Sequence, residues 1–156
     1  MTCEELSGAP DALVDFHTGL DDAPGVLGVA APVVALALRD ADACVRLEPE
    51  WSKGHGRRGN ALQGLRRYEE AKRSYERALE LDPGCAKALY RRGEARCELR
   101  DAAGACADAK ALLEVEPNGS AARALMRRAV ALRRDEQQKE SSAYRRMFGA
   151  DSDSDD

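Results

Sequence analysis

The stretch from Leu79 to Gly93, Leu-Glu-Leu-Asp-Pro-Gly-Cys-Ala-Lys-Ala-Leu-Tyr-Arg-Arg-Gly, decides the fold because both of its halves recur along the chain. The recurrences lie 34 residues away: Pro49 and Pro117 for Pro83, and Arg57-Arg58-Gly59 for Arg91-Arg92-Gly93. A 34-residue period with apolar residues at helical spacing predicts a helix-turn-helix repeat whose units stack side by side. Stacked repeats mostly serve as binding surfaces, so the period favours a scaffold.

Two complete helix pairs are expected on either side of the turn at Pro83. The first pair comprises residues 52–65 and 68–81, and the second comprises residues 86–99 and 102–115. Turns at Pro83 and at Pro117 separate the units, because proline cannot continue the helix that precedes it. Small residues recur at matching places, as close helix packing requires: Gly59, Ala71, Ala78, Gly93 and Ala105.

The flanking sequence completes an all-α expectation, a solenoid of about two and a half repeats with a long C-terminal capping helix. The start of the chain is expected to be irregular because glycines and prolines, Gly28 and Pro32 among them, interrupt it. In chain order we expect an irregular segment at 1–32, repeats over 33–119 (a half repeat at 33–49 and full units at 52–85 and 86–119), a helix at 120–148 and a disordered acidic tail at 149–156.

Charge and cysteine usage bound the function. The net charge of -4 combines -8 over residues 1–50, +8 over 51–150 and -4 over the last six residues, which favours an acidic ligand for the basic block. Five cysteines without a Cys-x-x-Cys pair favour reduced thiols and no metal site. No secretory signal is visible, and the apolar run at 26–38 is shorter than the ~20 residues of a membrane span. A cytoplasmic or nuclear protein without membrane contact is therefore expected.

The repeat resembles the tetratricopeptide repeat family over about residues 33–148, because its glycines, alanines and prolines fall on that family's small-residue and proline positions. The run Glu48-Pro-Glu-Trp-Ser-Lys-Gly-His-Gly-Arg57 is similar to the co-chaperone branch, as in the Hsp70–Hsp90 organising protein. The run Ala86-Lys-Ala-Leu-Tyr-Arg-Arg-Gly-Glu-Ala95 resembles the last repeat of the large immunophilins. This resemblance implies a groove with a carboxylate clamp, which grips the C-terminal Glu-Glu-Val-Asp of cytosolic heat-shock chaperones of the 90 or 70 class.

Five residues are predicted to bind such a peptide, and we call them the groove residues: Lys53, Arg57, Asn60, Lys87 and Arg91. Each Lys-Arg pair is spaced i, i+4, so both side chains project from one face of a first helix. First helices line the concave side of a stacked superhelix, so the pairs are expected to share one groove. Like charges at this spacing destabilise a helix by about 0.2–0.5 kcal/mol, which an anion bound between them would offset.

Simpler explanations of these charges stay open. The cations can be solvated surface charges, and Arg91 can pair with Glu94 three residues further on. The family's clamp also uses a lysine and an asparagine of the first repeat and an asparagine of the second. If residues 86–119 are the third repeat, these positions hold Asp22, Val26 and Arg57; if residues 52–85 are the third repeat, two upstream repeats are missing. In either frame the clamp is expected to be partial. Either residues 1–32 replace a helix pair, or the chain is a fragment of a larger immunophilin-like protein. A generic scaffold with a different protein partner is the alternative function.

Other functions are less favoured. Neither His17 nor His55 has the neighbours that nucleophilic catalysis needs, so we predict no enzyme, no catalytic residue and no cofactor, and a packing role for His55. Nucleic-acid binding through the arginine pairs lacks the stacking aromatics of single-strand binders. The apolar patch of Tyr144, Met147 and Phe148 resembles an immunophilin tail segment suspected of binding calmodulin. The expectation that we prefer is that this patch packs back on the repeats.

Overall fold

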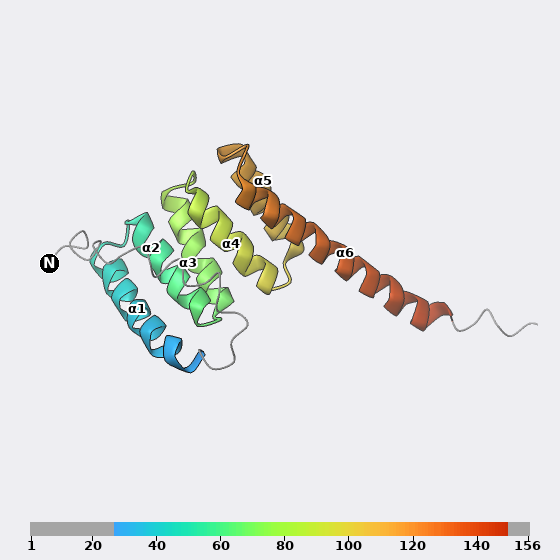
Figure 1. Ribbon diagram of the computed structural model, residues 1–156, viewed down its shortest axis with the longest axis horizontal. Helices are drawn as coiled ribbons and strands as arrows, with labels where there is room; N and C mark the ends of the chain where they lie inside the picture. Colours follow the sequence, from blue (N-terminus) through green and yellow to red (C-terminus); the bar gives the residue numbers. More distant parts are fainter. Residues whose placement is uncertain (1–26, 150–156) are drawn as a thin grey trace, which may run out of the picture.

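The computed structural model describes residues 27–149, and the structural statements below concern this part of the chain. It consists of helices joined by short turns (Figure 1). The bounds are α1 Leu27–Leu47, α2 Ser52–Gly64, α3 Tyr68–Leu81, α4 Ala86–Glu98, α5 Ala102–Val115 and α6 Ser120–Phe148. The all-α prediction is confirmed, and α2 to α5 form the two expected helix pairs, each helix ending within one residue of the expected position.

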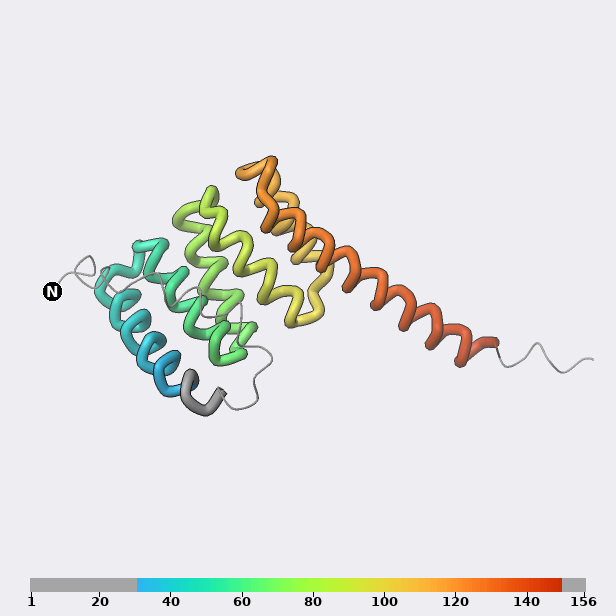
Figure 2. The backbone as a smooth tube through the Cα atoms, in the orientation of Figure 1, coloured from blue at the N-terminus to red at the C-terminus, as the bar shows by residue number. Residues whose placement is uncertain are grey.

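The helices form a row in which each packs against the next one in the sequence (Figure 2). Among helices two apart in the described part of the chain, the larger contacts lie on one side. There α2 contacts α4 and α4 contacts α6, whereas α1, α3 and α5 make no comparable contact with one another within residues 27–149. The first helices of the repeats are therefore closer together than the second helices, which places α2, α4 and α6 on the inner side of the solenoid.

The expected boundary at residue 33 is wrong, because α1 begins at Leu27 and contains Pro32. Proline lacks the N–H that would bond the carbonyl four residues back, and its ring crowds that same carbonyl. Here that carbonyl belongs to Gly28, the second residue of α1, so the disturbance is confined to the end of the helix. The expectations for residues 1–26 and 150–156 lie outside the described residues.

Close approach between helices depends on the two repeat glycines. A Cβ added to Gly59 would lie 2.6 Å from a ring carbon of Tyr75, and one added to Gly93 would lie 2.4 Å from a methyl carbon of Leu125. Both partners are in the core, where Tyr75 is 1% and Leu125 is 2% exposed. The small residues Ala71, Ala78 and Ala105 are also buried, as expected. The 34-residue recurrence of small side chains therefore follows from helix packing.

A buried ion cluster joins α4 to α5. Asp108 is 1% exposed, and its carboxylate lies 2.6 Å from Arg92 Nη2 and 2.9 Å from Arg96 Nη1. One repeat earlier, Arg58 occupies the place of Arg92; its Nε donates to Asp42 at 2.6 Å and its Nη1 to the Ser74 hydroxyl at 2.9 Å. The second arginine of each Arg-Arg-Gly motif is thus a structural residue that links its helix to a neighbour.

The turn inside each repeat ends in an arginine with a left-handed backbone. Arg66 has φ 59° and Arg100 has φ 64°. After α2, the Arg66 amide donates to the Gln63 carbonyl and the Arg67 amide to the Leu62 carbonyl, both at 2.9 Å. This is the Schellman arrangement that closes a helix, in which the left-handed position is usually glycine.

Replacing Arg66 by glycine is therefore expected to raise the free energy of unfolding by about 0.5–1 kcal/mol, because glycine has no Cβ to crowd the following carbonyl. Urea denaturation followed by circular dichroism measures the change. Arg100→Gly is the matched comparison and should gain less, because Arg100 also pairs with Asp135 at 2.7 Å. A fall in stability for Arg66→Gly would show that the turn is not strained.

The second half of α6 extends beyond the row of repeats (Figure 1). The apolar patch near its end is exposed, with Tyr144 at 65%, Met147 at 71% and Phe148 at 64%. The expectation that this patch packs back on the repeats is wrong, because the straight helix carries it away from them. Calmodulin binding through the patch stays a prediction.

Within residues 27–149, no helix has the length and apolar character that crossing a bilayer would require.

Candidate peptide-binding site

The groove residues lie on the inner helices α2 and α4, which contact each other. Lys53, Arg57 and Asn60 follow each other at i, i+4 and i+7 on α2, and Lys87 and Arg91 take the first two of these positions on α4. The spacing keeps each set on one helix face. The faces meet where Gln63 Nε2 of α2 lies 3.5 Å from Glu94 Oε2 of α4.

The two lysines and Arg57 are available to a ligand. Lys53 and Lys87 are exposed, and no ion pair within residues 27–149 uses either ammonium group. The Arg57 guanidinium lies over the Trp51 ring at 5.4 Å from its centroid, a cation–π contact that leaves the N–H donors at its edges available. These three cations can therefore meet an anion without first breaking an ion pair.

Asn60 is held by a tyrosine from α3. The Tyr75 hydroxyl donates to Asn60 Oδ1 at 2.7 Å and lies 3.0 Å from Gln63 Oε1. Burial raises the pKa of the Tyr75 phenol well above its usual value, so it stays a donor at neutral pH. With Oδ1 engaged, the NH2 group is the part of Asn60 that can donate to a peptide carboxylate.

Arg91 is already paired within the chain. Its Nη1 donates to Glu94 Oε2 at 3.0 Å, and the two side chains are 17% and 19% exposed. The pairing that the i, i+3 spacing left open is therefore formed. Of the four cations of the groove, Arg91 enters a ligand complex only by sharing or releasing this carboxylate.

Two members of the site, Tyr75 and Gln63, are not predicted from the sequence. Both act across helices: the phenol reaches α2 from α3, and the amide reaches α4 from α2. The one sequence feature that points to Tyr75 is its place next to the polar Ser74 in an amphipathic helix. This feature alone is equally compatible with a tyrosine that packs in the core. The packing role predicted for His55 agrees with the structure, in which His55 is 8% exposed and its Nε2 lies 2.8 Å from the Pro49 carbonyl oxygen.

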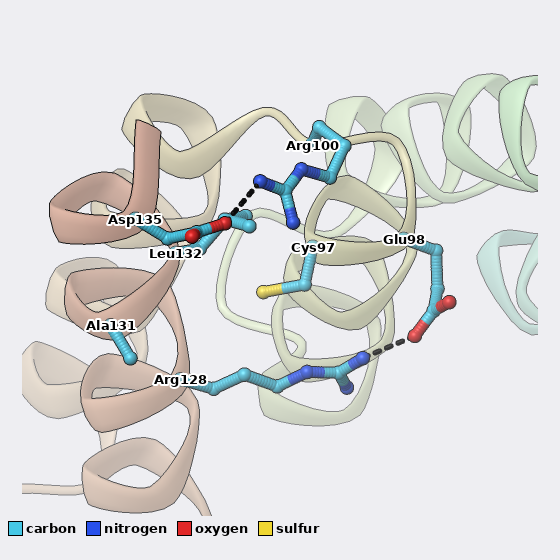
Figure 3. A pocket seen from close by; sticks show the side chains of 7 residues that line it. All are labelled: Cys97, Glu98, Arg100, Arg128, Ala131, Leu132 and Asp135. Atoms are coloured by element: carbon cyan, nitrogen blue, oxygen red, sulfur yellow. Dashed lines mark hydrogen bonds and ion pairs between the residues drawn. The ribbon is translucent and has the colours of Figure 1, made fainter. Parts of the chain in front are cut away.

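A cavity of about 420 Å³ lies elsewhere, between the end of α4 and α6 (Figure 3). Its charged rim is neutralised within the chain, because Arg128 pairs with Glu98 and Arg100 pairs with Asp135. The Cys97 thiol faces this space, and burial raises its pKa, so it stays protonated at neutral pH. None of the groove residues lines the cavity, and its paired charges offer nothing to a ligand carboxylate.

In the part of the chain that the structure describes, no group of three or more histidine, cysteine, aspartate or glutamate side chains lies close enough together to hold a metal ion. What the inner face offers is a row of cations and amides. Such a row can bind a carboxylate through charge-assisted hydrogen bonds.

The family model described as tetratricopeptide repeat matches residues 52–85, which comprise α2, α3 and the turn that follows them. The chain contains a tetratricopeptide repeat. Among curated proteins, it is 52% identical over 46 residues to heat shock protein STI1 of Saccharomyces cerevisiae, covering 30% of this chain and 8% of that protein. It is 41% identical over 78 residues to the FK506-binding protein-like of Mus musculus, covering 50% of this chain and 22% of that protein. The matches thus span less than a quarter of either relative.

Solved structures extend the comparison beyond the single matched repeat. The second tetratricopeptide domain of human RPAP3, in complex with the HSP70 peptide SGPTIEEVD, superposes with a TM-score of 0.60 at 25% identity. The alignment covers 62% of this chain and 80% of that one. The aligned helices therefore have the tetratricopeptide solenoid architecture, as expected from the 34-residue period.

Proposed function

We propose that this tetratricopeptide chain is a protein-interaction adaptor of the co-chaperone type. It binds the acidic C-terminal peptide of a cytosolic heat-shock chaperone, of the 90 or 70 class, through a partial carboxylate clamp. The observation that carries the proposal is the placement of two Lys-Arg pairs on contacting inner helices, with Lys53 and Lys87 both exposed. Two cations one repeat apart on one inner surface suit two neighbouring carboxylates, such as a C-terminal group and an acidic side chain beside it.

The relatives support this choice of ligand. The RPAP3 domain that shares the solenoid architecture is in complex with a peptide that ends in Glu-Glu-Val-Asp. The segment most similar to STI1 is short, 46 residues, and the match to the tetratricopeptide model at 52–85 covers the α2 half of the groove. The peptide is therefore proposed for this chain on the charge pattern of the groove together with this likeness.

The magnitudes favour modest affinity. A charge-assisted hydrogen bond contributes roughly 1.5–3 kcal/mol net, so four give about 6–12 kcal/mol before the peptide is ordered. Ordering a flexible peptide costs several kcal/mol. We therefore expect a dissociation constant near micromolar, which corresponds to a standard free energy of binding of about -8 kcal/mol.

Binding of a labelled Ser-Gly-Pro-Thr-Ile-Glu-Glu-Val-Asp peptide, measured by fluorescence polarisation, tests the proposal. We expect micromolar affinity for the free acid and a loss of about tenfold or more for the C-terminal amide, which lacks one of the two adjacent charges. Raising the salt from 50 to 500 mM should weaken binding of the free acid, because Lys53 and Lys87 are exposed to solvent and their attraction for the peptide is screened. Equal binding of acid and amide would contradict a carboxylate clamp, and no binding of either would refute the function.

Nucleic-acid binding has less support. Arginines of four Arg-Arg pairs bond acids of the chain itself, which lowers the charge available to phosphate: Arg58 to Asp42, Arg67 to Glu70, Arg92 to Asp108 and Arg128 to Glu98. Tetratricopeptide domains are interaction scaffolds, and we further propose that this chain has no catalytic activity of its own. A cytoplasmic location is proposed with the chaperone partner.

A further inference from the structure

Glu94 occupies on α4 the place that Asn60 occupies on α2. Asn60 follows Lys53 by seven residues and Glu94 follows Lys87 by seven, so stacking brings both to equivalent points of the inner surface. The two repeats therefore differ in one chemical respect at this point. One presents a neutral amide, and the other presents a carboxylate of the same charge as the proposed ligand.

The Glu94 carboxylate is held among groove side chains. Its Oε2 accepts from Arg91 Nη1 at 3.0 Å and lies 3.5 Å from Gln63 Nε2, with the glutamate side chain only 19% exposed. The pKa of the Tyr90 phenol is raised, mainly by burial and next by the adjacent Glu94 carboxylate. Glu94 thus meets Arg91 and Tyr90 on its own helix and Gln63 on the next inner helix.

We propose that Glu94 is an internal competitor of the peptide carboxylate and sets the charge that a ligand needs. The inference rests on the proposed function, because it takes Arg91 as a ligand-binding residue. In the free protein Glu94 occupies one edge of the Arg91 guanidinium. A ligand carboxylate must displace it, or bind beside it against like-charge repulsion in a half-buried groove where the effective dielectric is well below that of water.

The competition gives selectivity. A ligand with one carboxylate gains from Arg91 about what it loses by displacing Glu94, whereas a ligand with two adjacent carboxylates also gains from Lys87 and from the α2 pair. Glu94 therefore discriminates against singly charged peptide ends, by adding a repulsive element to an attractive site.

Two substitutions test this, Glu94→Gln, which keeps the shape of the side chain, and Glu94→Asn, which copies Asn60. The matched control is Glu114→Gln, the same charge change at an exposed position of α5. Fluorescence polarisation with the free-acid and amidated Ser-Gly-Pro-Thr-Ile-Glu-Glu-Val-Asp peptides gives the dissociation constants, and circular dichroism checks that each variant is folded. We expect both Glu94 variants to bind the free acid about tenfold more tightly at 50 mM salt, and Glu114→Gln to stay within twofold of the unsubstituted protein. The gain should be larger for the amide, because its end carries the single charge that Glu94 discriminates against.

The outcomes separate this inference from the function it rests on. If the unsubstituted protein binds the free acid and the Glu94 variants bind it equally or more weakly, competition is wrong, while the clamp stands. If only the Glu94 variants bind, competition is supported in its strongest form. If no protein binds the free acid, the proposed function fails and the inference fails with it.

Discussion

Replacing Asp108 by alanine is expected to lower the free energy of unfolding by about 3–5 kcal/mol, because it leaves two arginines without their buried counter-ion. Arg92 donates to one oxygen of this carboxylate through Nε at 3.1 Å and Nη2 at 2.6 Å, and Arg96 Nη1 lies 2.9 Å from the other oxygen. The arginine side chains are themselves only 19% and 17% exposed, so water replaces the lost partner incompletely. A loss of this size is a large part of the 5–15 kcal/mol that stabilises a typical domain.

Urea denaturation of Asp108→Ala followed by circular dichroism measures the effect. Asp40→Ala removes an exposed carboxylate from α1 and serves as the control, with an expected change within about 0.5 kcal/mol. Asp108→Asn keeps the shape and one acceptor and should fall between the two. If Asp108→Ala unfolds within 1 kcal/mol of the unsubstituted protein, the buried cluster contributes little to stability and the desolvation of its charges offsets their attraction.

The second large effect is expected on binding. Lys87→Ala combined with Arg91→Ala should weaken binding of the free-acid peptide by about a hundredfold or more, since two charge-assisted hydrogen bonds are lost at roughly 1.5–3 kcal/mol each. The variant also leaves the Glu94 carboxylate without its Arg91 partner on the inner face, which adds repulsion to the loss of attraction. Pull-down with immobilised peptide, followed by fluorescence polarisation, measures it.

The control for this variant carries the same loss of charge on the second helices. Arg73→Ala combined with Lys110→Ala removes two exposed cations, one from α3 and one from α5, and should change binding by less than about threefold at physiological salt. Unchanged capture by the Lys87/Arg91 variant would reject the clamp. Equal weakening by both double variants would show that the peptide responds to net charge and to no particular site.

Much of the fold could be predicted from the sequence because its signals are periodic and local. The prolines at 83 and 117 mark where helices stop, a role that depends only on neighbouring residues. The glycines at 59 and 93 recur at the repeat period, although their packing partners, Tyr75 and Leu125, lie on other helices. The start of α1 was mispredicted because the breaking effect of a proline depends on its position in the helix. Pro32 lies close enough to Leu27 for the helix to form around it.

For the groove residues the sequence predicts a helix face but not the pairing of each charge. The i, i+4 spacing places Lys53 with Arg57 on one helix and Lys87 with Arg91 on another, and these helices are α2 and α4, which contact each other. It does not tell which cation is engaged within the chain. Arg91 and Arg92 are adjacent in sequence, yet one points to Glu94 and the other to the buried Asp108.

The sequence by itself determined the repeat length, the helices of both complete units and the helix face that carries each groove residue, because these depend on contacts within a few residues and on a 3.6-residue turn. Only the tertiary structure decided that Tyr75 holds Asn60 from another helix, that Asp108 is buried between two arginines, and that the end of α6 is left exposed. The reason is physical: burial and pairing across helices depend on which side chains the stacking of the helices brings within hydrogen-bond distance. That distance is set by packing, which the order of residues along one helix does not encode.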